Sequence, residues 1–254
     1  MLKTSAGSFS LDFKRGARSR NHKKKGIEME KIKVMVVDDH VVVRTGLKAL
    51  LNKQADLEVI AEAENGAEAV EKARETNPDV IIMDITMPIM DGIEATKRLK
   101  KEKAENHVVA LTVHEDKQFL IQMMKAGASG YISKQARSEE LVAAIQTAAS
   151  GNVFLQPTQL RWLVEGYHAP APKRSAGAGA AAGTEKTELS MLSKREIQVL
   201  ELVAKGLTST EIGEKLGISP KTIYRHRDRI KNKLKIRSNS ELVLFAIRTG
   251  LVEV

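Results

Sequence analysis

Five short apolar runs, each followed by a segment of helical period, constrain the fold of this chain more than any other feature. The runs predict strands near 32–37, 57–61, 80–83, 107–112 and 130–133. The intervening segments predict helices near 41–52, 65–76, 92–103, 117–126 and 138–150. Strands that alternate with helices form a parallel sheet covered on both faces, and runs without polar alternation are typical of strands buried on both sides. We therefore expect residues 31–150 to form an α/β domain with a five-stranded, doubly wound parallel sheet.

The composition excludes several classes of protein. The chain has 254 residues and no cysteine, which excludes disulfides, thiolate catalysis and cysteine-based zinc sites. Its apolar stretches are too short to span a membrane. Residues 1–30 carry many basic side chains but no apolar segment, so they do not resemble a secretory signal. We expect a cytoplasmic protein whose residues 1–30 form a disordered basic extension, or one whose true start is Met29.

The charge is distributed unevenly. The formal net charge of the whole chain is +9. Residues 31–150 carry a net charge of −3, whereas residues 190–254 carry +6. A basic domain is typical of nucleic-acid binders, and charge asymmetry between the halves of a chain indicates two separate tasks.

Polar side chains follow four of the predicted strands, at the point where each strand ends. They are Asp38-Asp39, Asp84, Thr112 and Lys134. The carboxyl ends of parallel strands meet at one edge of the sheet, where open α/β folds place their sites. Three carboxylates can hold a hard divalent cation there, and a hydroxyl and an ammonium group can hold an anion beside it. This combination suits the transfer of a phosphoryl group onto Asp84.

The segment MDITMPIMDG, whose acceptor aspartate lies forty-five residues after the second aspartate of VVDDH, resembles the receiver domain of two-component response regulators. The resemblance covers residues 31–150 and implies a flavodoxin-like fold. It implies that Asp84 is the phosphoacceptor, and that Mg²⁺ is held by Asp38, Asp39, Asp84 and the backbone carbonyl of Thr86. It also implies that Thr112 and Lys134 contact the phosphoryl group and that Tyr131 is the aromatic switch residue.

A phosphatase with an aspartyl nucleophile is the enzyme alternative. Such enzymes need a second acid two residues after the nucleophile, and that position is Thr86 in this chain. A phosphoaspartate that acts as a signal must be hydrolysed slowly. The missing acid therefore favours a switch, which catalyses only its own phosphorylation and slow dephosphorylation, over a turnover enzyme.

Helical period returns in residues 190–254, which we expect to form a separate all-α domain of four helices. Ser193 to Glu196 and Thr208 to Glu211 each form a capping-box pattern, and Ser219-Pro220 is a strong helix start. A fourth helix is expected to begin at Ser240. Two short helices separated by a glycine-containing turn indicate a helix-turn-helix.

The stretch LSKREIQVLELVAKGLTSTEIGEKLGISPKTIYRHRDRIKNKLKI resembles the LuxR-type helix-turn-helix of the NarL/FixJ response-regulator family. The resemblance implies sequence-specific binding of double-stranded DNA. It also implies a dimer that reads paired half-sites, formed through an exposed apolar stripe on the last helix.

A helical wheel of the third helix of this domain separates a buried face from a DNA face. Ile223, Ile230 and Leu234 share the face that packs against the other helices. The opposite face can enter a major groove, where Tyr224, Arg225 and Asp228 are predicted to read bases. Asp228 either accepts from a cytosine or pairs with Arg225, and Arg227 is expected to snorkel at the edge of the buried face. The predicted phosphate contacts are Lys221, Lys231, Lys235 and Arg237.

Residues 151–189 are expected to connect the two domains through a short helix and a flexible linker rich in Ala, Gly and Pro. The sequence thus predicts a transcription regulator whose DNA binding is controlled when a histidine kinase phosphorylates Asp84. A DNA-binding module that ignores phosphorylation remains the alternative.

Overall fold

The computed structural model describes residues 30–103, 105–113, 116–168 and 188–252. The predicted basic extension and the Ala/Gly/Pro-rich part of the linker lie almost wholly outside these ranges. None of the helices within the described ranges is long and apolar enough to cross a membrane.

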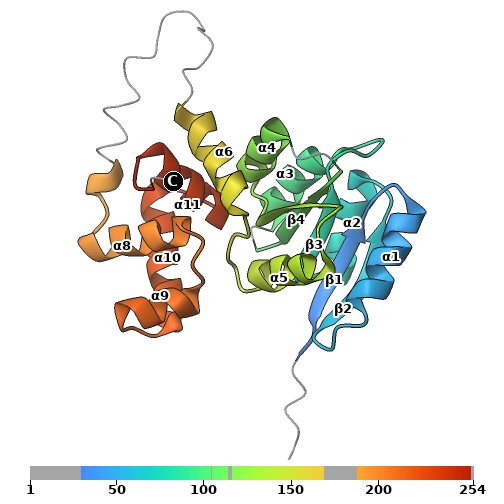
Figure 1. Cartoon of the computed structure of the whole chain (residues 1–254), viewed down its shortest axis with the longest axis horizontal. Coiled ribbons are helices and arrows are strands. Elements are labelled where there is room, and N and C mark those ends of the chain that lie inside the picture. Colours follow the sequence, from blue (N-terminus) through green and yellow to red (C-terminus); the bar gives the residue numbers. More distant parts are fainter. Residues whose placement is uncertain (1–29, 104, 114–115, 169–187, 253–254) are drawn as a thin grey trace, which may run out of the picture.

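The first half of the chain alternates strands and helices as predicted (Figure 1). The strands are β1 (Ile32–Val37), β2 (Leu57–Ala63), β3 (Val80–Asp84), β4 (His107–Thr112) and β5 (Gly130–Ser133). The helices are α1 (Val41–Leu51), α2 (Gly66–Thr76), α3 (Gly92–Glu102), α4 (Lys117–Ala126) and α5 (Ser138–Ala149).

The five strands form one parallel sheet in the order β2-β1-β3-β4-β5. One apolar layer joins the sheet to α1 and α5, with Leu51 and Leu141 among its buried residues. The other joins it to α2, α3 and α4, through Val70, Leu99 and Met123. Because both faces are covered, the strands are continuous apolar runs, and the predicted flavodoxin-like fold class is confirmed.

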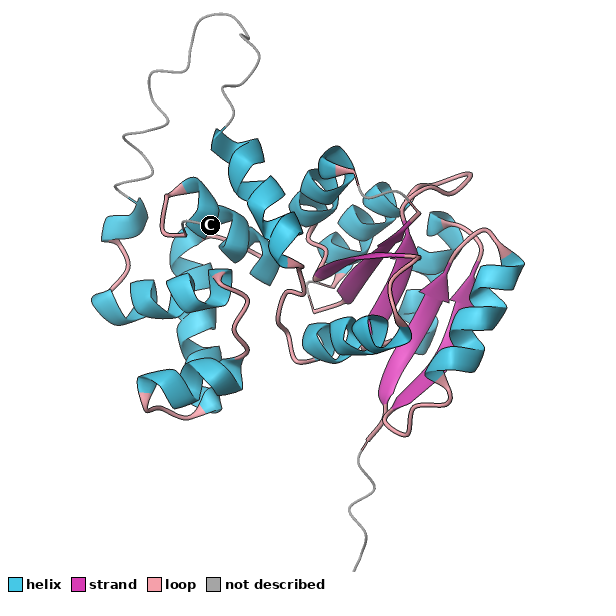
Figure 2. Cartoon of the chain, in the orientation of Figure 1, coloured by secondary structure: helices cyan, strands magenta, loops and turns pink. Residues whose placement is uncertain are grey.

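After α5, the described residues form helices and loops, apart from one isolated β-bridge between Phe154 and Gly130 (Figure 2). The helices are α6 (Pro157–His168), a short turn of helix at 188–190, α8 (Lys194–Ala204), α9 (Ser209–Leu216), α10 (Pro220–Leu234) and α11 (Asn239–Arg248). Both predicted capping boxes are present, at Ser193 and Thr208. Gly217 ends α9 with a φ of 67°, a left-handed conformation that glycine adopts without strain.

The predicted start of the last helix is wrong by one residue, because α11 begins at Asn239 and not at Ser240, whereas α5 begins at Ser138 as predicted. The residue before α5 is Arg137, and its side chain makes no capping hydrogen bond. The cap of α11 is Ser238 rather than Ser240, since the Ser238 side chain accepts from the backbone N–H of Glu241. Ser238 and Ser240 are both hydroxyl residues near an acidic residue, so the sequence pattern alone does not select one of them as the cap.

The expected exposed apolar stripe on the last helix is a further prediction that the structure contradicts. The residues from Leu242 to Ile247 are all buried. Helix α11 packs against α8 of its own domain and also against α6 and α4. The apolar surface that the sequence assigned to dimerisation is therefore covered within this one chain.

Candidate functional site

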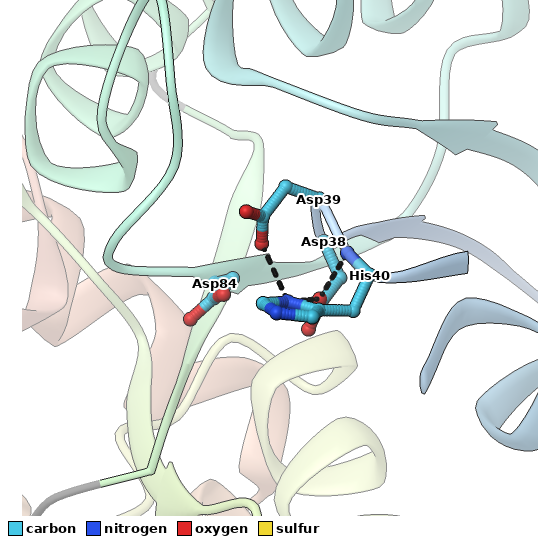
Figure 3. A group of neighbouring side chains, drawn as sticks. All are labelled: Asp38, Asp39, His40 and Asp84. Carbon is cyan, nitrogen blue, oxygen red and sulfur yellow. Dashed lines mark hydrogen bonds and ion pairs between the residues drawn. The ribbon is translucent and has the colours of Figure 1, made fainter. Parts of the chain in front are cut away.

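The acidic residues at the ends of β1 and β3 lie together at the carboxyl edge of the sheet (Figure 3). The cluster consists of Asp38, Asp39, His40 and Asp84, each of which offers one ligand atom within 4.8 Å of the others. Asp38 is fully buried and Asp84 is 5% exposed, whereas Asp39 is accessible to solvent. The structure therefore brings together the three carboxylates that the sequence assigned to a metal site.

His40 belongs to this cluster and was not among the predicted site residues. Its Nδ1 lies 2.8 Å from a carboxylate oxygen of Asp39 and 3.3 Å from one of Asp38. Its backbone N–H also donates to Asp38 at 2.9 Å. The only sequence signal for this residue was its position directly after the aspartate pair.

Lys134 lies between the two buried carboxylates. Its Nζ is 2.5 Å from Asp38 Oδ2 and 2.8 Å from Asp84 Oδ2, and its side chain is 12% exposed. Lys134 therefore neutralises part of the negative charge that would otherwise destabilise two neighbouring buried acids.

Burial and this ion pair act in opposite directions on the pKa of Asp84. Burial raises the pKa of Asp84, while the hydrogen bond and charge of Lys134 oppose that rise. For Lys134 itself burial favours a lower pKa, but the hydrogen bonds and charges of Asp38 and Asp84 outweigh burial and raise it. Lys134 is therefore a fixed cation at neutral pH, held beside the carboxylate that the sequence predicts as the phosphoacceptor.

Two further residues lie against the backbone of the aspartates in the acid cluster. Arg44 of α1 is 7% exposed and donates to the backbone carbonyl of Asp38 at 2.7 Å. Gly92, at the start of α3, lies so close to Asp84 that a Cβ atom there would be 2.1 Å from the Asp84 carbonyl oxygen. The role of Arg44 could not be predicted from the sequence, since a single basic residue on a helix carries no distinguishing pattern.

The predicted switch residues lie on the two strands beside the cluster. Thr112 is 5% exposed at the end of β4, and its backbone carbonyl accepts from the N–H of Lys134 at 2.6 Å. Tyr131 of β5 is fully buried, and its hydroxyl donates to the carbonyl of Asp116 at 3.4 Å. Asp116 caps α4, the helix that packs against α11 and α6. The hydrogen bond from Tyr131 to Asp116 thus connects β5 with the helix that contacts the second domain.

The helix predicted to read DNA faces the first domain. The Tyr224 hydroxyl donates to the backbone carbonyl of Ser150 at 3.2 Å, just beyond the end of α5. Arg227 donates to the Asn152 side chain at 2.6 Å and to the Gly151 carbonyl at 2.5 Å. Asn239, in the first turn of α11, also donates to the Gly151 carbonyl. The two domains are therefore joined directly at residues 150–152.

Arg227 corrects a prediction, because its side chain does not snorkel to the surface. It is only 2% exposed, and its charge is held by neutral groups, which include the Ser209 hydroxyl at 3.0 Å. Burial lowers the pKa of Arg227 to about 10, so the guanidinium remains charged at neutral pH.

The other predicted DNA-contacting residues lie mainly at the surface. Those that are exposed are Lys221, Tyr224, Arg225, Asp228, Lys235 and Arg237, and Lys231 is partly buried. Within the described part of the chain, Asp228 forms its ion pair with Lys231, at 3.1 Å, rather than with Arg225. Ile223 and Ile230 are fully buried, as the helical wheel predicted.

Comparisons with known proteins agree with both halves of this arrangement. Residues 34–146 match the response regulator receiver domain, and residues 190–246 match the bacterial regulatory proteins of the luxR family. These two matches define a response regulator with a LuxR-type DNA-binding domain.

Relatives of known name match most of the chain. The "Oxygen regulatory protein NreC" of Staphylococcus carnosus is 36% identical over 223 residues, which cover 87% of this chain and all of that protein. A two-component response regulator of the LuxR family from Aurantimonas sp. SI85-9A1 is 34% identical with a TM-score of 0.51, over 54% of this chain and 98% of that one. The RcsB response regulator of Salmonella typhimurium is 26% identical with a TM-score of 0.50, over 85% of this chain and 97% of that one. The chain belongs to the NarL/FixJ family of two-component response regulators, and it is a transcription regulator rather than a classical enzyme.

Proposed function

We propose that Asp84 accepts a phosphoryl group from a histidine kinase. Asp84 is supported in this role by its position at the end of β3, beside a buried lysine and two further carboxylates. In the transfer, an Asp84 carboxylate oxygen bonds to phosphorus while the bond from phosphorus to the donor nitrogen breaks. Catalysis of such a step rests on positioning and on charge stabilisation.

Receiver domains generally bind Mg²⁺ in an acidic pocket, and the donor set here fits that ion. Mg²⁺ takes oxygen ligands and retains several waters, so a few carboxylates suffice. Asp38, Asp39 and Asp84 would hold it, together with the backbone carbonyl of Thr86. When bound, the ion would neutralise the charge that develops on the transferred group. Lys134 would then turn from the carboxylate of Asp84 to the phosphoryl oxygens, with the hydroxyl of Thr112 as a further donor.

The proposed output of this reaction is the release of the DNA-binding helix. Tyr224 and Arg227 of α10 donate hydrogen bonds to residues 150–152, so these contacts tie the helix to the receiver and would have to break for it to move away. Repositioning of Thr112 and Tyr131 would act on α4 through Asp116, and α4 contacts α11. Movement of α4 would separate the domains and also uncover the apolar side of α11.

Once released, α10 would enter the major groove of double-stranded DNA. Tyr224, Arg225 and Asp228 would face base edges, and Lys221, Lys231, Lys235 and Arg237 would contact phosphates. A homodimer that reads paired half-sites follows from the same release, since α11 is then exposed. We expect the protein to act in the cytoplasm, where its kinase and its DNA are accessible.

Labelling with acetyl phosphate tests the proposal. We expect Mg²⁺-dependent labelling of the wild-type protein and none of the Asp84→Asn variant. Footprinting on genomic DNA should then show sites that are protected more strongly after labelling. Labelling that persists in the variant would disprove the acceptor assignment, whereas protection that is equal in both states would indicate a DNA-binding module that ignores phosphorylation.

A further inference from the structure

Two adjoining hollows lie in the seam between the receiver and the DNA-binding domain, away from the acid cluster. Their volumes are about 230 and 130 Å³, and both are lined by Lys100, Arg237 and Ser238. Lys100 comes from α3 of the receiver, whereas Arg237 and Ser238 precede α11 of the DNA-binding domain. We call this space the seam pocket.

The seam pocket is strongly basic. Its basic side chains are Lys97, Lys100, Lys101, Lys231 and Arg237. Its two carboxylates are Glu105 and Glu241. The carboxylate of Glu241 is engaged at the start of α11, where it accepts from the backbone N–H of Arg237 at 3.2 Å and from the Ser238 hydroxyl at 3.3 Å. Positive charge therefore dominates the space.

The basic residues of α3 meet those of the DNA-binding domain only because the two domains are in contact. Lys100 is half-buried, and its aliphatic stem lies over Gly127, where a Cβ atom would be 3.0 Å from Lys100 Cγ. Burial first, and then the charge of Lys231 from the other domain, lowers the pKa of Lys100 to about 8, although Glu241 opposes this. An anion between the two lysines would offset their mutual repulsion and would favour the charged form of Lys100.

The surroundings add neutral groups that suit an anion with several oxygen atoms. Ser129, Ser238 and Asn239 line the smaller hollow. Ser238 and Asn239 belong to the start of α11, and a helix N-terminus carries a partial positive charge. Arg237 and Lys231 are also residues that we expect to bind DNA phosphates.

We propose that the seam pocket binds a small anion that carries phosphate groups and that such an anion holds the two domains together. It would occupy Lys231 and Arg237 and so compete with DNA for the same side chains. Binding of the anion does not depend on phosphorylation of Asp84; only its effect on DNA binding rests on the proposed function.

Isothermal titration calorimetry with pyrophosphate tests the proposal on the full chain. Mg²⁺ is left out, so that the acid cluster takes up no phosphate, and the ionic strength is held constant with potassium acetate. ATP and inorganic phosphate in parallel titrations separate a nucleotide site from a site for the bare phosphate group. We expect saturable binding of one pyrophosphate per chain, weakened about tenfold or more by Lys100→Gln and by Arg237→Gln.

The control variants are Lys53→Gln and Arg161→Gln, which change exposed residues of the same type that do not line the pocket. Their affinity should equal that of the wild type, and the exposed Arg237 provides a second variant if Lys100→Gln does not fold. Pyrophosphate should also raise the unfolding temperature of the wild type but not that of Lys100→Gln. The absence of saturable binding, or an equal loss in the control variants, would overturn the proposal.

Discussion

Arg227 of α10 donates to the side chain of Asn152 at 2.6 Å, across seventy-five positions of sequence and across the boundary between the two domains. Its guanidinium also donates to the Gly151 carbonyl and the Ser209 hydroxyl, so these three partners are all neutral groups. A buried arginine that is satisfied by neutral groups depends on each of them, because loss of one leaves a charged donor without compensation. The pair is therefore a sensitive point of the contact between receiver and DNA-binding helix.

We predict that Asn152→Ala strengthens DNA binding by the unphosphorylated protein. A hydrogen bond to a charged group contributes about 1.5–3 kcal/mol, and the other partners of Arg227 remain, so an increase of about tenfold is expected. Fluorescence anisotropy with an operator fragment measures the effect. After treatment with acetyl phosphate, wild type and variant should bind the operator fragment with equal affinity. If the variant binds more tightly by the same factor with and without phosphorylation, the effect does not arise from the contact between the domains.

Lys134→Ala is predicted to strengthen the binding of Mg²⁺ and to abolish the effect of phosphorylation on DNA binding. Removal of the cation from between Asp38 and Asp84 leaves their negative charge for Mg²⁺, so the affinity for the ion should increase about tenfold or more. The same variant should lose the increase in DNA affinity after phosphorylation, since the phosphoryl group has lost its fixed cationic partner. Calorimetric titration with Mg²⁺ provides the first readout, and unchanged or weaker binding would contradict the placement of this lysine.

Gly92→Ala is predicted to disturb the acceptor directly. The added Cβ would meet the Asp84 carbonyl oxygen at 2.1 Å, and overpacking of this kind costs about 1–3 kcal/mol. Urea unfolding should show the loss, and labelling by acetyl phosphate should slow. Gly46→Ala in α1 is the matched control, because a Cβ there meets nothing within 4 Å, and it should stabilise the helix by about 0.5–1 kcal/mol.

His107 is predicted to make the stability of the structure, in which the two domains are in contact, decrease at acidic pH. Burial, followed by the charges of Lys100, Arg227 and Lys231, lowers the pKa of His107 to about 4, although Asp79 acts in the opposite direction. An unfolded histidine has a pKa of about 6.5, so the unfolded state binds more protons between these values and stability falls as pH decreases through this window.

The expected loss of folding free energy is about 2 kcal/mol between pH 7 and pH 5. Part of it should appear as domain opening, because Arg227 and Lys231 belong to the second domain. Thermal unfolding over this pH range measures the loss. The His107→Gln variant should show a flatter pH dependence, and an identical slope would assign the effect to other groups.

The receiver could be predicted from sequence almost completely. Its strands are continuous apolar runs, and its candidate site residues follow the ends of those strands. The hydrophobic pattern therefore predicted both the strands and the place where the candidate site residues meet. The acid cluster followed because Asp38 and Asp84 end neighbouring strands. His40 and Arg44 were missed, since neither side chain has a periodic signal.

The contact between the domains could not be predicted in the same way. The hydrophobic pattern around Arg227 concerns a single helix, whereas the burial of the Arg227 side chain depends on Asn152 in a distant segment of the sequence. The apolar face of α11 likewise indicated a buried surface, but the pattern could not indicate that α8, α4 and α6 of the same chain cover it in this structure. Amphipathic patterns show that a face is covered, and they carry no information about what covers it.

A distance measurement between the domains tests most directly whether phosphorylation opens the protein. The chain contains no cysteine, so spin labels can be placed at Lys53→Cys in the receiver and Lys215→Cys in α9 without removing native thiols. Before phosphorylation, electron–electron double resonance should give one narrow distance distribution. After phosphorylation with acetyl phosphate and Mg²⁺, the distribution should shift and broaden in the wild type but not in Asp84→Asn. An unchanged narrow distribution in fully phosphorylated wild-type protein would contradict the release of the DNA-binding helix.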